Sequence, residues 1–314
     1  MHAKYIYNAS ATAANILADV ILILTGTTTP ASLSASCNTA TTTISAAYAV
    51  AGWSVYDASA GANAQVLRAL NTDATTYRYL EINTNSAGYF LCKVWESWNS
   101  GTHAGTNLAF FSDMTSYAQQ LDVTNGGVLY IDASAHYAIF HSMKTTGNVW
   151  GDSSNHGGCG LIERTRLLPF DTTANNYPTA VFVSLGVMAY SSTLFCCWSP
   201  RVIDYGSNVL SGSGASFFAR TWMSTPSDIF SSYNGTTMKI PDGAGATYIP
   251  CAPIWLQLSP GNMPACYGDI STNSGLYVIP QSVAANLDTV LISSTTYIVY
   301  QESSTTMLMI LPMG

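Results

Sequence analysis

Alternation of hydrophobic and polar positions is clearest in the first third of the chain, between Trp53 and Trp98. Four short runs are separated there by clusters of Gly, Ala, Ser, Asn, Thr and Asp, and they are Trp53–Asp57, Gln65–Ala69, Tyr77–Ile82 and Tyr89–Trp98. Runs rich in β-branched and aromatic residues and bounded by turn formers are typical of strands joined by short turns. The pattern predicts an antiparallel meander that forms half of a sandwich.

Neither face of this meander is cleanly polar. Side chains alternate along a strand, so the run Tyr77–Ile82 has one arginine and two aliphatic residues on one face, and two tyrosines and a glutamate on the other. The two sets are Arg78, Leu80 and Ile82, and Tyr77, Tyr79 and Glu81. We therefore expect both faces of the meander to be at least partly covered.

Helical periodicity occurs once, over residues 10–25. Apolar residues recur there on one helix face, at Ile16, Leu17, Val20, Ile21 and Leu24. Ser10 is the expected N-cap, and Gly26 is expected to end the helix. The small polar stretch that follows, with Pro30 as a helix breaker, predicts an irregular connection to the meander.

The rest of the chain predicts short strands and long loops. Residues 99–127 are expected to form a loop with one helical turn, residues 145–160 a glycine-rich surface loop, and residues 191–275 a region of long loops. The expected strands are Val128–Asp132, Tyr137–Met143, Leu161–Leu168 (closed by Pro169), Ala180–Tyr190, Leu276–Pro280, Thr289–Ser293, Tyr297–Gln301 and Met307–Leu311, with a tight turn at Ser294–Thr296.

These elements predict a mainly β protein of antiparallel, sandwich-like sheets with one N-terminal helix and long loops. The expected halves are residues 1–125, with the helix and the meander, and residues 126–314, with the long loops. No linker marks this boundary, so a single domain is the alternative.

Charge changes the picture more than any other property of the composition. Charged residues make up 9% of the chain, against about 25% in a typical soluble domain. A surface of Ser, Thr, Asn, Gly and Tyr suits a protein that is covered by neighbours in an assembly, and an ordinary neutral β protein is the alternative. The net charge of −7, with no basic cluster beyond Arg164 and Arg166, argues against direct nucleic-acid binding.

The N-terminal segment and the cysteines bear on the compartment. Asp19 interrupts the first apolar region, and no strong basic start precedes it, so no signal peptide is expected. The longest apolar run, Val20–Leu24, is far too short to span a bilayer. Seven cysteines occur without a CxxC spacing, at Cys37, Cys92, Cys159, Cys196, Cys197, Cys251 and Cys266. Free, buried cysteines made in a cytoplasm are expected, and an intermolecular bridge in an oxidised particle is the alternative.

No residue pattern defines a catalytic, cofactor or metal site. The histidines other than His2 (His103, His136, His141 and His156) lack the spacing of metal ligands. One mixed-charge region contains Asp152, His156, Glu163, Arg164, Arg166 and Asp171. A structural ion pair explains it more simply than the paired carboxylates of a glycosidase. No GxSxG motif occurs, and the glycine-rich segments 211–216 and 241–248 lack the Lys and Ser/Thr of a P-loop.

Aromatic residues are the remaining candidates for binding. The tryptophans Trp95, Trp98, Trp150, Trp198, Trp222 and Trp255, together with 19 tyrosines, are suited to sugar-binding platforms. Packing in the core or at subunit interfaces is the simpler interpretation, because aromatic side chains dominate both.

Three stretches together resemble structural proteins of tailed bacteriophage virions. The first is GWSVYD at 52–57 with its continuations VLRALN, YRYLEINT and YFLCKVWESWN. The second is IERTRLLPFDTTANNYPTAVFVS at 162–184, and the third is STTYIVYQESSTTMLMILPMG at 294–314. The resemblance implies a lightly charged β protein of the virion, and it transfers no catalytic or binding residue.

We therefore expect a non-enzymatic virion component, made in the host cytoplasm, that assembles into a symmetric multimer in the tail, baseplate or neck. Its expected partners are copies of itself and other virion proteins, without direct contact to nucleic acid or membrane, and without a cofactor. Residues 191–275 are the expected inter-subunit contacts. The alternatives are a capsid decoration protein, a tail-fibre module that binds a receptor or a host surface glycan, and a depolymerase that uses Glu163 and Asp171.

Overall fold

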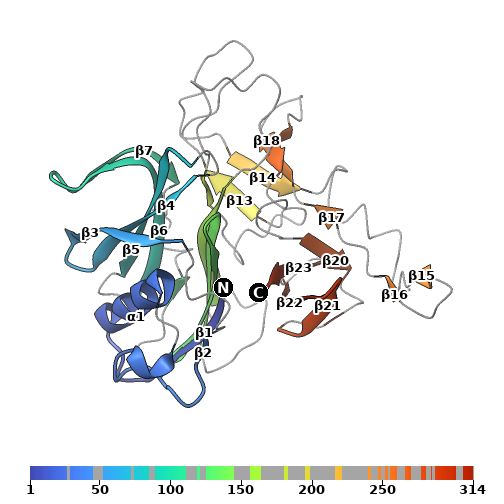
Figure 1. Ribbon diagram of the computed structural model, residues 1–314, viewed down its shortest axis with the longest axis horizontal. Coiled ribbons are helices and arrows are strands. Elements are labelled where there is room, and N and C mark those ends of the chain that lie inside the picture. Colours follow the sequence, from blue (N-terminus) through green and yellow to red (C-terminus); the bar gives the residue numbers. More distant parts are fainter. Residues whose placement is uncertain are drawn as a thin grey trace, which may run out of the picture.

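The computed structural model is mainly β, with antiparallel sheets and one α-helix in the residues that it describes, as the sequence predicts (Figure 1). The described residues are 1–26, 29–44, 52–71, 74–84, 89–110, 119–120, 125–144, 156–163, 180–182, 195–198, 216–220, 240–241, 247–248, 252–253, 255–259, 266–269, 277–280, 284, 287–301 and 307–313.

The first sheet brings the N-terminus together with the middle of the chain. Its order is β12-β11-β10-β9-β1-β2. The strands are β1 (His2–Tyr7), β2 (Thr43–Ile44), β9 (Gly127–Ser134), β10 (Tyr137–Lys144), β11 (His156–Glu163) and β12 (Ala180–Phe182). Strand β1 pairs with β9 from His2↔Asp132 to Tyr7↔Gly127. The two expected halves of the chain, on either side of residue 125, therefore share this sheet.

The second sheet is the predicted meander, and all four predicted strands are present. Its order is β3-β4-β5-β6-β7, and β8 also pairs with β6. The strands are β3 (Ser54–Gly61), β4 (Ala64–Leu70), β5 (Tyr77–Thr84), β6 (Tyr89–Asn99), β7 (Ala104–Phe110) and β8 (Gln119–Gln120). Strands β7 and β8 lie within residues 99–127, so the loop predicted there was wrong at these two segments. Residues 111–118 and 121–124 lie outside the described residues, and the helical turn stays a prediction. The segment of β7 is only weakly apolar, so its own sequence does not indicate a strand. It forms a strand because it pairs with β6 across the hairpin.

The C-terminal part of the chain forms further antiparallel sheets. One has the order β17-β20-β23-β22-β21, with β17 (Ala252–Pro253), β20 (Tyr277–Pro280), β21 (Thr289–Ile292), β22 (Thr295–Gln301) and β23 (Met307–Pro312). Another is β13-β14-β18-β19, with β13 (Phe195–Trp198), β14 (Ser216–Arg220), β18 (Trp255–Ser259) and β19 (Cys266–Asp269). The short strands β15 (Ile240–Pro241) and β16 (Thr247–Tyr248) pair with each other.

Predicted strand ends and loops differ from the structure in several places. The turn between β21 and β22 is Ser293–Ser294, both at positive φ, so it comes earlier than the predicted turn at 294–296. His156 to Gly160 belong to β11 rather than to the glycine-rich loop, because they pair with β10. Residues 145–155, 164–169 and 183–190 lie outside the described residues. Within 191–275 the described residues form short strands, and the remainder falls outside the description.

Helix α1 (Ala13–Thr25) confirms the predicted apolar face, but its start was predicted wrongly. Thr12, not Ser10, is the N-cap: its hydroxyl accepts a hydrogen bond from the backbone N–H of Asn15, and the Asn15 side chain accepts one from the backbone N–H of Thr12. This reciprocal pair satisfies N–H groups that have no partner within the helix. Gly26 ends the helix at φ 123°, as predicted.

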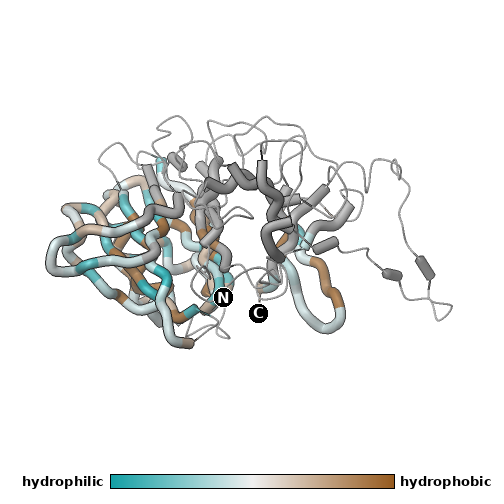
Figure 2. Tube along the Cα trace, turned by 90° about the horizontal axis from the view of Figure 1, so that it is seen from above, coloured by the Kyte–Doolittle hydropathy of each residue, from teal (hydrophilic) through white to brown (hydrophobic). Residues whose placement is uncertain are grey.

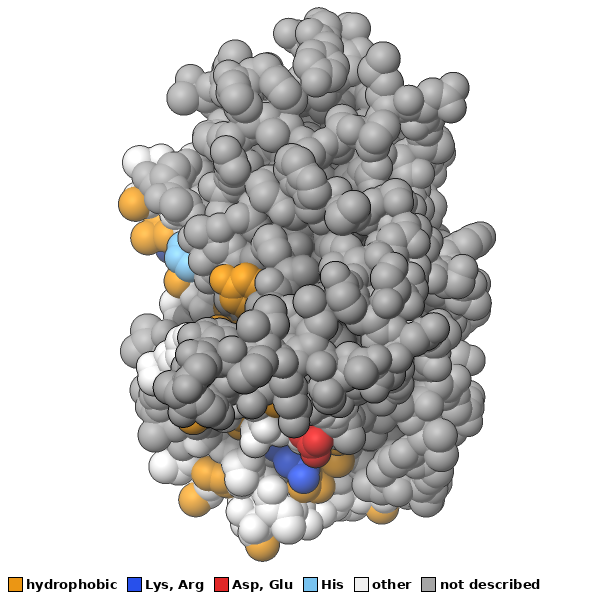
Figure 3. Space-filling model, turned by 90° about the vertical axis from the view of Figure 1, so that its right-hand side faces the viewer, with side chains coloured by type: hydrophobic (Ala, Val, Ile, Leu, Met, Phe, Trp, Pro, Cys, Tyr) orange, Lys and Arg blue, Asp and Glu red, His pale blue; other side chains and the backbone are white. Residues whose placement is uncertain are grey.

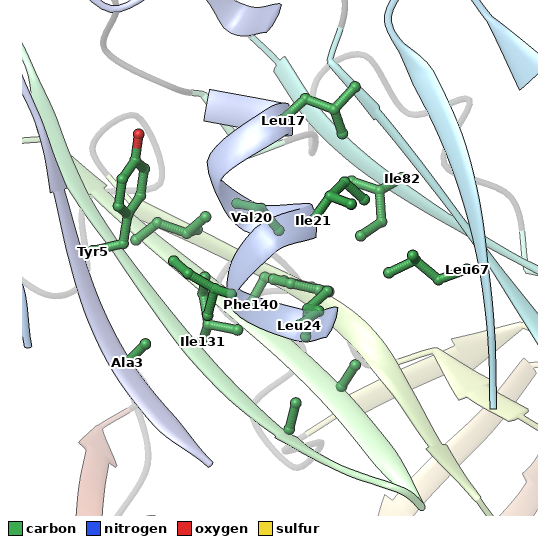
Figure 4. Close-up of a cluster of buried hydrophobic side chains, with 14 of the residues drawn as sticks. Ala3, Tyr5, Leu17, Val20, Ile21, Leu24, Leu67, Ile82, Ile131 and Phe140 are labelled. Carbon is green, nitrogen blue, oxygen red and sulfur yellow. The ribbon is translucent and has the colours of Figure 1, made fainter. Parts of the chain in front are cut away.

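The main core lies between the first two sheets, with α1 inserted between them. Figure 4 shows Val20, Ile21 and Leu24 of the helix between Ile131 and Phe140 on one side and Leu67 and Ile82 on the other. All of these side chains are buried. Strand β1, which the sequence analysis did not predict, contributes Ala3, Tyr5 and Tyr7 to the same core.

A buried carboxylate anchors α1 within this core. Asp19, 1% exposed, accepts hydrogen bonds from Tyr5 Oη at 2.7 Å and from Ser34 N and Oγ at 2.7 and 2.8 Å. Burial raises the pKa of Tyr5, and the hydrogen bond to Asp19 and the charge of that carboxylate raise it further. Asp19 thus joins the helix to β1 and to the connection that follows the helix.

Two of the seven cysteines have described side chains. Neither Cys37 nor Cys92 forms a disulfide bond, and both are buried, as predicted for the cysteines in general. Burial raises the pKa of the Cys37 thiol, and the nearby charge of Asp19 adds to this, while the hydrogen bond to Thr42 opposes it. The Cys37 thiol is therefore kept neutral and inert at physiological pH.

Candidate functional site

The side of the meander opposite α1 carries a continuous set of aromatic and charged residues. We call this set the aromatic face, and it consists of Tyr56, Arg68, Tyr77, Tyr79, Glu81, Lys93 and Trp95. The strand register places Arg68, Tyr79 and Trp95 opposite one another on β4, β5 and β6. Glu81 and Lys93 form the adjacent pair. The expected alternation of β5 is confirmed, because Leu80 and Ile82 point into the core.

Arg68 is stacked between two tyrosine rings. Its guanidinium carbon lies 4.6 Å from the ring centroid of Tyr56 and 4.4 Å from that of Tyr77. Such cation–π contacts hold the planar guanidinium in place. Burial and the neighbouring Tyr56 raise the pKa of Tyr79, and the charge and hydrogen bond of Arg68 partly oppose this. The rings of Tyr56 and Tyr79 are 5.2 Å apart, so these four residues form one packed unit.

Trp95 is fixed on three sides. Its indole N–H donates to Glu81 Oε2 at 2.8 Å, and its ring packs edge-on against Trp98 with centroids 5.6 Å apart. Gly105 on β7 lies against the ring, and a Cβ at that position would come within 2.2 Å of it. The glycine therefore leaves the space in which the half-buried indole lies against β7.

Glu81 links Trp95 to the only ammonium group on the aromatic face. Lys93 Nζ donates to Glu81 Oε1 at 3.2 Å, and the lysine side chain is 26% exposed while that of the glutamate is 8% exposed. Both carboxylate oxygens of Glu81 thus have donors. Lys93 can still offer its remaining N–H groups to a molecule in solution, because an ammonium has three donors.

A second buried carboxylate joins the two ends of the meander. Asp57 on β3 accepts hydrogen bonds at Oδ2 from Trp98 Nε1 and His103 Nδ1, both at 2.8 Å, and at Oδ1 from Ser59 N at 3.0 Å. Burial alone would raise the pKa of Asp57, but the hydrogen bonds from His103, Trp98 and Ser59 and the charge of His103 outweigh it and lower the pKa to about 2. Asp57 thereby connects β3, β6 and the β6–β7 turn.

His103 is the exposed member of this cluster. Its side chain is 43% exposed, and its backbone has φ +51°, which only a small fraction of non-glycine residues adopt. A carboxylate accepts only, so Nδ1 carries the proton and Nε2 is directed away from Asp57. The cluster fixes the β6–β7 turn, which leads directly into β7 and to Gly105 next to Trp95.

The mixed-charge region predicted from sequence is mostly not described. Glu163 is the last residue of β11 and is paired with Ala180, and His156 is the first residue of the same strand. Asp152, Arg164, Arg166 and Asp171 lie outside the described residues. The expected structural ion pair among these residues stays a prediction.

The other candidates are dispersed over the molecule. His2 is bound to Asp132 at 2.7 Å, while His136 lies in the β9–β10 turn and His141 on β10. Trp198 and Trp255 are on β13 and β18, whereas Trp150 and Trp222 lie outside the description. The glycine-rich segments 211–216 and 241–248 are described only where they enter strands.

Sequence analysis missed Asp57, Arg68, Lys93 and Gly105 as parts of one site. The scarcity of charged residues was the usable signal, because a charge inside a strand of such a chain needs a partner. Asp57 binds Trp98 and His103, which are 41 and 46 residues away in the chain. The sequence alone does not predict contacts over such separations.

Comparison with known proteins does not indicate a function, so the functional argument depends on the fold and on this site. No family model and no curated protein matches the chain. Across the described residues, no group of three or more His, Cys, Asp or Glu side chains is arranged to hold a metal ion. No helix in the described part of the chain is long and apolar enough to cross a membrane. What the structure defines is a mainly antiparallel β protein with an aromatic and charged sheet face.

Proposed function

We propose that the chain is a non-enzymatic structural component of a bacteriophage virion that assembles into a symmetric multimer in the tail, baseplate or neck. Its resemblance to virion proteins and its low content of charged residues support this proposal. A weakly charged surface lowers the desolvation cost of burying large interfaces. On the view in Figure 3, the described side chains are mostly hydrophobic or uncharged.

The observation that carries the proposal is the edge strand β21. It is the last strand of its sheet in the described order, and Thr289–Ile292 contains no charged residue. Val290 and Ile292 pack toward Val299, whereas Leu291 is 69% exposed, the highest value among the large hydrophobic residues described. The hairpin that contains β21 is visible in Figure 2. Monomeric proteins protect such edges with charges, prolines or bulges, so this edge suits pairing with another subunit.

Leu291→Lys is expected to weaken self-association at least about tenfold, because it removes apolar burial and places a charge at the edge. The measurement is the molar-mass distribution of the full chain as a function of concentration by analytical ultracentrifugation. Leu22→Lys is the matched control, since Leu22 is an exposed leucine of α1 at 40%. It is expected to leave association unchanged.

Two results would contradict the proposal. One is a wild-type chain that stays monomeric at high concentration, and the other is absence of the chain from purified virions by mass spectrometry. If the chain is present, immunogold labelling with antibody to residues 241–250 distinguishes a tail position from capsid decoration.

A further inference from the structure

We propose that the aromatic face is a saccharide-binding site, in which a sugar ring stacks on the exposed rings and its hydroxyl groups bond to Arg68 and Lys93. The proposal concerns the surface of the meander and does not depend on where the chain is located. It rests on three observations, which are the preorganisation of the rings, the polar groups beside them and the extent of the surface.

The rings are held before any ligand arrives. Trp95 is fixed by its hydrogen bond to Glu81, by Trp98 and by Gly105. Its neighbour Trp98 is itself held by Asp57. Rigid aromatic groups bind at low entropic cost, because fewer side-chain rotamers are lost on binding. The ring that is held in this way is half-buried, so the protein does not enclose it fully.

Polar groups lie directly beside these rings. Arg68 and Lys93 offer donors, with Arg68 opposite Tyr79 and Lys93 opposite Glu81 in the strand register. A sugar has an apolar C–H face and a rim of hydroxyl groups, so it needs rings and hydrogen-bonding groups together. The face carries two positive charges and one negative charge, which is far from a basic patch, and the chain carries −7 overall. A polyanionic nucleic acid therefore fits this face less well.

The surface is large enough for an oligosaccharide. Arg68, Tyr79 and Trp95 lie on three adjacent strands, so the row spans two strand spacings, about 10 Å. Tyr56 and Tyr77 extend it on either side of Arg68. Tyr56, Tyr77, Tyr79 and Trp95 are all half-buried rather than fully buried, so the row is open to solvent in part.

The test is binding of the full chain to an array of oligosaccharides that contain neutral hexoses, N-acetylated amino sugars, or uronic and sialic acids. The wild-type chain is expected to bind at least one class. Tyr77→Ala is expected to weaken that binding about tenfold or more, while Tyr77→Phe keeps the ring and stays within about threefold. Arg68→Lys keeps the charge but loses the planar stack, and is expected to weaken binding at least about tenfold.

Thermal unfolding of each variant shows whether it is folded, and Arg68→Lys keeps the test valid if Tyr77→Ala does not fold. Leu22→Lys is the control, and its binding is expected to equal that of the wild type. The proposal is overturned if the wild-type chain binds no saccharide on the array, or if folded Tyr77→Ala and Arg68→Lys bind as the wild type does. It is also overturned if single-stranded oligonucleotides bind this face in place of saccharides.

Discussion

Replacing Asp19 with alanine is expected to lower the free energy of unfolding by about 4 kcal/mol. The substitution leaves three buried or half-buried donors, Tyr5 Oη, Ser34 N and Ser34 Oγ, without their acceptor. Each unsatisfied donor costs about 1–3 kcal/mol, and the lost side chain leaves a cavity. Chemical unfolding in urea, followed by tryptophan fluorescence, measures the loss.

Two further variants show whether the hydrogen bonds of Asp19 cause this loss. Asp19→Asn keeps the shape and one acceptor oxygen, so its loss of stability is expected to lie between those of the wild type and Asp19→Ala. Ser54→Ala replaces an exposed serine of β3 and is expected to change stability by less than about 0.5 kcal/mol. A loss below about 1 kcal/mol for Asp19→Ala would show that the interactions of Asp19 do not anchor the helix.

The contrast between α1 and Asp19 shows how far the sequence determines the fold. The apolar period of α1 and its end at Gly26 were predictable, because both depend on neighbours within a few residues. From the sequence, Asp19 was interpreted as an interruption of the apolar segment. In the structure it is buried, because Tyr5 and Ser34, 14 and 15 residues away, supply donors that no local pattern reveals.

The meander shows the same division between local and long-range information. The strands around Arg68 and Tyr79 were predicted from their alternation, which is a property of each strand alone. Strand β7 was missed, because its pairing with β6 is imposed by the hairpin rather than by its own composition. Gly105 lies on that missed strand, so the support of Trp95 was hidden as well.

The proposal of self-association and the proposal of saccharide binding concern two surfaces of the protein that differ in charge and composition. The edge of β21 is uncharged and apolar, which suits pairing with another chain. The aromatic face combines rings with charges, which suits a small polar ligand. Because the two surfaces lie on different sheets, the variants Leu291→Lys and Tyr77→Ala test them independently.

Asp57→Asn is expected to remove most of one acid-sensitive component of the stability. In the wild type the pKa of Asp57 is lowered from its ordinary value of 3.8 to about 2. A carboxyl whose folded pKa is lowered stabilises the fold above the unfolded pKa, and this contribution disappears as the pH falls through the folded pKa. The shift corresponds to about 2 kcal/mol. The wild type is therefore expected to lose this amount between about pH 5 and pH 2 through Asp57 alone.

The measurement is the difference in unfolding free energy between the wild type and Asp57→Asn from pH 7 to pH 2. At pH 7 the variant is expected to be less stable by about 3 kcal/mol, because the amide N–H groups face either the donors of both Trp98 and His103 or the backbone N–H of Ser59. Between about pH 4 and pH 2 the difference is expected to shrink by about 2 kcal/mol, since the Asp57 carboxyl of the unfolded wild-type chain takes up a proton there while that of the folded chain stays ionised until about pH 2. Ser54→Ala, an exposed substitution that changes no titratable group, controls for general acid effects. A difference that stays constant with pH would show that Asp57 does not hold β3, β6 and the β6–β7 turn together as a carboxylate, and the support of the aromatic face would then lie elsewhere.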